Sequence, residues 1–156
     1  MNIQELQRRV YENSVEHGFY DYRQDVSIVK TFLAELSSVD GHDLTLYATL
    51  HRILADYETL QLERKLLLAI GELCEAHEEL RVGHHPTEIY TKGEFGNAAG
   101  MARDFNEKPE GFPIEVADAV IRILDMSDST GVDVESAVAT KTAYNSTRPH
   151  KHGKKF

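Results

Sequence analysis

The chain has 156 residues, the length of one ordinary domain, and its 41% hydrophobic and 28% charged residues are typical of a globular protein rather than a disordered one. A formal net charge of -9 disfavours general electrostatic binding to nucleic acid or to an anionic membrane. No apolar run approaches the roughly 20 residues of a membrane span, and no signal-peptide core opens the chain. The single cysteine, Cys74, cannot form an internal disulfide. We therefore expect one cytoplasmic domain over residues 1–156.

Apolar residues recur at helical spacing in the first half of the chain. Residues 2–17 and residues 25–38 each predict a helix. Asp43 can cap a third helix, which we expect to end near Thr59. The pattern favours an all-α fold.

The second half of the chain contains the strongest helical pattern, over residues 60–82. Residues 84–112 follow with scattered glycines and no clear pattern, and loops of that length inside a domain are usually functional or disordered. Residues 113–129 predict a helix with a proline in its first turn. Asp133 can cap a last helix over 134–145.

Two of these helices carry a stripe of acidic residues that is separate from the apolar face. At 100° per residue, the acids of the first stripe fall within about 60° of one another, and the residues of the second share one face. The first stripe contains Glu72, Glu75 and Glu79, and the second contains Glu115, Asp118, Arg122 and Asp125.

Such stripes are most often the solvated faces of amphipathic helices. We interpret Glu79 and Asp125 as belonging partly to such a face, and Asp118 with Arg122 as an i,i+4 pair. The inner four acids differ from an ordinary salt-bridged surface, because no lysines lie between them. These four are Glu72, Glu75, Glu115 and Asp118.

Pairs of carboxylates at i and i+3 on two facing helices suit Mg²⁺, which prefers oxygen ligands in near-octahedral geometry. Two helices packed 8–10 Å apart, a general spacing for helix pairs, bring both pairs to one ion or to two. A di-iron centre of the helical-bundle type would need Glu-x-x-His motifs, and the sequence contains none.

Five blocks in order give the sequence a resemblance to a known family. They are ELQRRVYENSVEHGF, LLLAIGELCEAHEELR, KPEGFPIEVADAVIRILD, GVDVESAVATKTAYN and RPHKHGKKF. Together they resemble the MazG-like nucleoside triphosphate pyrophosphohydrolases of the all-α NTP pyrophosphatase superfamily.

The resemblance implies a helical bundle whose four-helix Mg²⁺ site is completed in a homo-oligomer, a dimer or a tetramer. It implies hydrolysis of a nucleoside triphosphate, a dNTP or a non-canonical NTP, to the monophosphate and pyrophosphate. The implied metal ligands are Glu72, Glu75, Glu115 and Asp118, with Mn²⁺ as a substitute for Mg²⁺. Lys141 and Asn145 match a lysine and an asparagine that the family uses on the following helix.

The chemistry of a triphosphate suggests further roles. Glu75 or Glu79 could take the proton of the attacking water, and the sequence does not choose between them. Lys141 and Arg148 could hold phosphate oxygens, and Asn145 could hydrogen-bond phosphate or sugar. A basic tail over about 147–156 adds further cations, although a disordered end would look similar.

Two features depart from the compact members of the family: the long segment 84–112 and an extra helical insertion at about 23–58. Two alternatives stay open. One is a noncatalytic helical oligomer that binds nucleotides or a protein partner. The other is a metal-dependent phosphohydrolase that releases orthophosphate instead of pyrophosphate.

Overall fold

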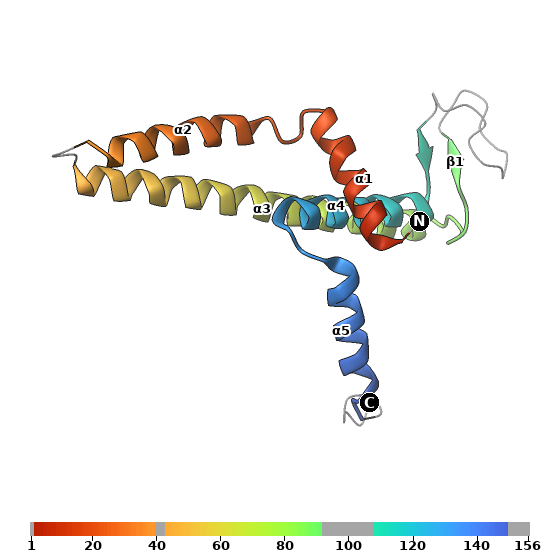
Figure 1. Cartoon of the computed structure of the whole chain (residues 1–156). Helices are drawn as coiled ribbons and strands as arrows, with labels where there is room; N and C mark the ends of the chain where they lie inside the picture. The colour runs from red at the N-terminus through yellow and green to blue at the C-terminus, as the bar shows by residue number, and fades with distance from the viewer. Residues whose placement is uncertain (1, 40–42, 92–107, 150–156) are drawn as a thin grey trace.

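The computed structural model describes residues 2–39, 43–91 and 108–149, and helices dominate these ranges (Figure 1). In chain order the elements are α1 (Ile3–Glu16), α2 (Tyr22–Ser37), α3 (Leu44–Arg81), β1 (Tyr90–Thr91), β2 (Pro109–Glu110), α4 (Phe112–Thr130) and α5 (Val134–Ser146). The predicted helical class is confirmed, with the addition of a small antiparallel sheet in which Tyr90 pairs with Glu110. In the described ranges, no helix is both long and apolar enough to cross a membrane. Most of the predicted tail, residues 150–156, lies outside those ranges.

Side-chain caps begin three of the helices. Asn2 accepts a hydrogen bond from the backbone N–H of Glu5 at 2.8 Å. The two predicted caps are confirmed: Asp43 accepts from the second and third residues of α3, and Asp133 accepts from the N–H of Ser136 at 3.0 Å. Each cap satisfies N–H groups that have no partner within the helix.

The predicted helix end near Thr59 is wrong, because α3 continues as one helix of 38 residues. At 1.5 Å per residue, such a helix is about 57 Å long. The sequence has no proline in this range and no glycine before Gly71, so nothing interrupts the hydrogen-bonded ladder at residues 59–60.

The first part of α3 and α2 lie side by side as an antiparallel arm (Figure 1). Residues 23–58, which the sequence marks as an extra segment, belong to α2 and the first part of α3, and among the described residues only Ser38, Val39 and Asp43 at the connection are not helical. Val26 and Leu33 of α2 are buried in the arm, with Leu33 fully shielded from solvent.

The second part of α3 packs against α4, which runs back along it, and α1 packs on another side of α4 (Figure 1). Ala69 and Ala76 of α3 and Ala119 of α4 are buried. Because alanine side chains are small, they allow two helix backbones to approach closely. The α3–α4 contact places the candidate site.

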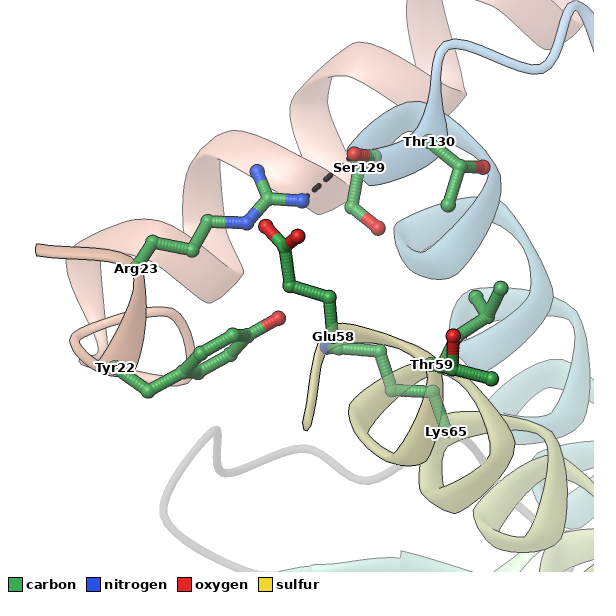
Figure 2. Close-up of a pocket in the computed structure, with 8 residues that line it drawn as sticks. Tyr22, Arg23, Glu58, Thr59, Lys65, Ser129 and Thr130 are labelled. Atoms are coloured by element: carbon green, nitrogen blue, oxygen red, sulfur yellow. Dashed lines mark hydrogen bonds between the residues drawn. The ribbon is translucent and has the colours of Figure 1, made fainter. Parts of the chain in front are cut away.

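The corner between α1 and α2 is held against α3 and α4 by polar contacts around Tyr20. The Tyr20 hydroxyl donates to the backbone oxygen of Asp125 at 3.1 Å, and Lys65 pairs with the Asp125 carboxylate at 3.0 Å. Arg23 donates to the backbone oxygen of Ser129 at 2.7 Å, across a pocket of about 260 Å³ (Figure 2). These contacts fix the end of α4 relative to the middle of α3.

Candidate metal centre

Three carboxylates from α3 and α4 meet where the two helices pack. Glu72, Glu115 and Asp118, here called the acidic trio, each offer an oxygen within 4.8 Å of the other two. Glu72 lies on the same helical face as the buried Ala69 and Ala76, so its side chain enters the contact with α4. Glu115 is 2% exposed, and the Glu72 side chain is 13% exposed. The structure thus brings together three of the four predicted metal ligands.

Burial and mutual repulsion raise the pKa values of two members of the trio. The pKa of Glu115 is raised mainly by desolvation and then by the charge of Glu75, while Lys108 opposes the shift. The pKa of Asp118 is raised mainly by desolvation and then by the charge of Glu72, while Arg122 opposes it. Both shifts mean that the fold holds negative charge at a cost.

The trio has the properties of a site for a hard divalent cation. Glu115 Oε2 is buried, and no hydrogen-bond donor among the described residues reaches it. A buried carboxylate oxygen without a donor is costly, and a cation bound to it would remove that cost. The donor set is all oxygen, as Mg²⁺ prefers.

Glu75, the fourth predicted ligand, lies beside the trio but outside the 4.8 Å group found among the described residues. It is exposed, and its charge is the leading charge that raises the Glu115 pKa. The side chain is therefore near Glu115 and open to solvent. The Glu75 carboxylate can therefore approach the acidic trio from its solvent-exposed edge.

Glu79 and Asp125 are not on a solvated face, so the interpretation of these two acids is wrong. The Tyr90 hydroxyl donates to Glu79 at 3.1 Å, and burial together with Glu79 raises the pKa of Tyr90 to about 12. His84 stacks on Tyr90, with ring centroids 4.6 Å apart. Asp125 is 7% exposed and pairs with Lys65. Tyr90, from the strand that follows α3, covers Glu79, and Lys65, 60 residues away in the sequence, covers Asp125.

Two cations act electrostatically on the trio: Arg122, predicted only as an i,i+4 partner of Asp118, and Lys108, for which no role was predicted. Arg122 donates from Nε to Glu72 Oε1 at 3.0 Å, so the predicted pairing with Asp118 is replaced by a pairing across the helices. Lys108 precedes β2 and pairs with Glu110 at 3.2 Å; Glu110 and the trio's Glu115 raise its pKa.

A glycine sets the position of this second cation. Gly111, between β2 and α4, has φ of 113°, and a Cβ there would fall 2.4 Å from the backbone oxygen of Glu88. The segment before β1 therefore passes directly against the start of α4. No spacing in the sequence announces this approach, because it depends on the pairing of β1 with β2.

The three predicted substrate-binding residues lie on α5 or just after it, and all are exposed. Lys141 and Arg148 lie over the Tyr144 ring, at 5.0 and 6.0 Å from its centroid. Helix α5 extends away from the α3–α4 layer (Figure 1), and its contacts are chiefly with α1. Among the described residues of a single chain, no hydrogen bond or ion pair joins Lys141, Asn145 or Arg148 to the acidic trio.

Comparisons of the chain with protein-family models, with curated proteins and with solved structures found no match. The chain itself offers three converging carboxylates, an exposed fourth acid, and two cations, Arg122 paired with Glu72 and Lys108 paired with Glu110.

Proposed function

We propose that the protein is a Mg²⁺-dependent nucleoside triphosphate pyrophosphohydrolase. It would hydrolyse a dNTP or a non-canonical NTP to the monophosphate and pyrophosphate. The observation that carries the proposal is the acidic trio, with its orphaned Glu115 oxygen at the α3–α4 contact. The five sequence blocks that resemble the MazG-like enzymes support the choice of reaction.

Glu72, Glu115 and Asp118 would hold the ion, with Glu75 at the edge, and Mn²⁺ would serve as a substitute. When bound, the ion supplies neutralisation of the phosphate charge and a water that loses its proton more readily. Of the two candidates for the general base, Glu75 fits better, because it is exposed beside Glu115 while the Tyr90 hydroxyl occupies Glu79.

Lys108 and Arg122, whose charges act on Glu115 and Asp118, would bind the phosphates from the same chain as the acids. Lys108 is 65% exposed in its side chain, so it can turn from Glu110 toward a bound anion. Lysine and arginine at such a site stabilise the charge of the departing pyrophosphate.

A homo-oligomer, a dimer or a tetramer, would explain the position of α5. Large apolar side chains are exposed along the two helices that carry the acids: Leu66, Ile70, Leu73 and Leu80 on α3, and Val120 and Ile123 on α4. Packing a second copy on these faces would bury them, which is favourable by about 25 cal/mol per Å² of apolar surface. A partner copy could then deliver its own Lys141, Asn145 and Arg148 to the acids.

The test is the identity of the products. Pure protein is incubated with Mg²⁺ and a panel of canonical and modified nucleoside triphosphates in ¹⁸O-labelled water, and products are separated and weighed by mass spectrometry. A monophosphate with pyrophosphate supports the proposal. Orthophosphate with a diphosphate indicates a phosphohydrolase, and no turnover with any substrate indicates a noncatalytic protein; either result contradicts the proposal.

A further inference from the structure

Arg122 pairs directly with one of the three carboxylates that form the candidate metal centre. Its Nε donates to Glu72 Oε1 at 3.0 Å, and the Glu72 side chain is 13% exposed. The Arg122 side chain is 39% exposed, three times the exposed fraction of the Glu72 side chain. In this ion pair, Glu72 is therefore the more buried partner and Arg122 the more exposed one.

The Glu72 carboxylate is also one of the proposed ligands of the divalent cation. Glu72 contributes to the acidic trio, whose oxygens lie within 4.8 Å of one another. Arg122 also offsets the raised pKa of Asp118, so its positive charge acts on two members of the trio. This guanidinium thus supplies part of the charge compensation that a bound cation would also supply.

The other cations of the α3–α4 contact have different partners. Lys65 pairs with Asp125, and Lys108 pairs with Glu110. Neither of these acids belongs to the trio. Arg122 differs from Lys65 and Lys108 because its ion-pair partner, Glu72, is itself a proposed metal ligand.

We propose that Arg122 is a built-in counter-ion of the metal centre: it pairs with Glu72 when no divalent cation is bound, and cation binding frees it to bind a substrate phosphate. The inference rests on the proposed function. A released guanidinium would suit a phosphate, because its planar fork of donors matches two phosphate oxygens. The same residue would then oppose metal binding and favour nucleotide binding.

Opposite effects on two affinities test this inference. The first measurement is Mn²⁺ affinity, obtained from the electron paramagnetic resonance signal of free Mn²⁺ titrated into the full-length protein. The second is the affinity of an α,β-imido nucleoside triphosphate, which resists cleavage, at saturating Mg²⁺. The variants are Arg122→Gln and Arg122→Lys, with circular dichroism to show that each is folded.

Arg122→Gln should bind Mn²⁺ roughly three- to tenfold more tightly than the wild type, because the competing charge-assisted hydrogen bond is gone. It should bind the analogue about tenfold more weakly. Arg122→Lys keeps the charge but lacks the fork, so its Mn²⁺ affinity should fall between the other two. A purely structural role would weaken both affinities together.

Arg81→Gln is the matched control, because Arg81 also lies on this pair of helices but forms an exposed pair with Glu78. Solvent and salt screen it, so both affinities should stay within about twofold of wild type. Unchanged or weaker Mn²⁺ binding by Arg122→Gln would overturn the inference, and so would an equal gain in Arg81→Gln. If wild type binds Mn²⁺ and cleaves nucleotides while Arg122→Gln changes neither affinity, only this inference fails. If wild type binds no Mn²⁺ at all, the proposed function fails with it.

Discussion

Glu115 is a proposed metal ligand whose buried negative charge is unfavourable for folding. It lies in the first turn of α4, where the helix dipole favours a negative charge, but it is buried and one of its oxygens has no donor among the described residues. Burial and the nearby Glu75 raise its pKa. A residue that weakens the fold in this way is typical of a functional site.

The raised pKa values of Glu115 and Asp118 predict how stability depends on pH. The folded chain retains protons that the unfolded chain has already released above its ordinary carboxyl pKa, near 4. The contribution of these two groups to the free energy of unfolding therefore falls as pH rises through their raised pKa values. Urea unfolding with a chelator present, between about pH 4 and pH 8, measures this fall.

A neutral double variant, Glu115→Gln with Asp118→Asn, isolates that contribution. It should gain stability relative to wild type as pH rises, by about 1 kcal/mol or more at neutral pH. The comparison cancels Glu78 and Glu88, whose pKa values are lowered by Arg81 and by His84 and which act in the opposite direction. Parallel curves for the two proteins would show that the acids carry no such cost.

At the scale of elements, the sequence correctly predicted features that depend on local patterns of residues. The caps Asp43 and Asp133 and the acidic stripes depend on neighbours within one or two helical turns. The contacts that complete the site are nonlocal: Tyr90 reaches Glu79, and the pairing of β1 with β2 sets the place of Lys108. No periodicity encodes such contacts, so the sequence could not supply them.

The continuity of α3 gives a direct test, because the predicted boundary and the observed helix make opposite predictions for Leu60→Pro. In an unbroken helix, a proline at residue 60 removes a hydrogen bond and clashes with the preceding turn, costing about 3 kcal/mol. At the first position of a separate helix it would be tolerated. Leu60 is 59% exposed, so Leu60→Ala is a control that should change stability little. Equal denaturant midpoints for the two variants would contradict the continuous helix.

At the scale of the whole molecule, one chain separates the two parts of the proposed site. The acids lie at the α3–α4 contact, while α5 carries Lys141 and Asn145 away from that layer (Figure 1). Apolar side chains are exposed along α3 and α4, and a second copy in the proposed oligomer would cover them. In the proposed oligomer, α5 of one copy would lie near the acids of another copy.

Mixing two inactive variants tests this arrangement. Glu115→Gln removes an acid, and Lys141→Ala removes a cation on α5; each alone should lose most turnover. In a mixed oligomer with sites shared between copies, one site carries both substitutions and the other carries neither. Random mixing into dimers should restore about a quarter of wild-type activity. Mixtures no more active than the separate variants would place Lys141 and the acids in the same chain's site, or Lys141 outside it.

The central claim is that Glu72, Glu115 and Asp118 hold a divalent cation, and the most direct measurement is Mn²⁺ binding by calorimetry. Wild type should show saturable binding that Mg²⁺ displaces, and Glu115→Gln should lose it while keeping its helical circular dichroism. Glu78→Gln, which removes an exposed acid from the same helix pair, should bind like wild type. Equal Mn²⁺ binding by wild type and Glu115→Gln would contradict the account.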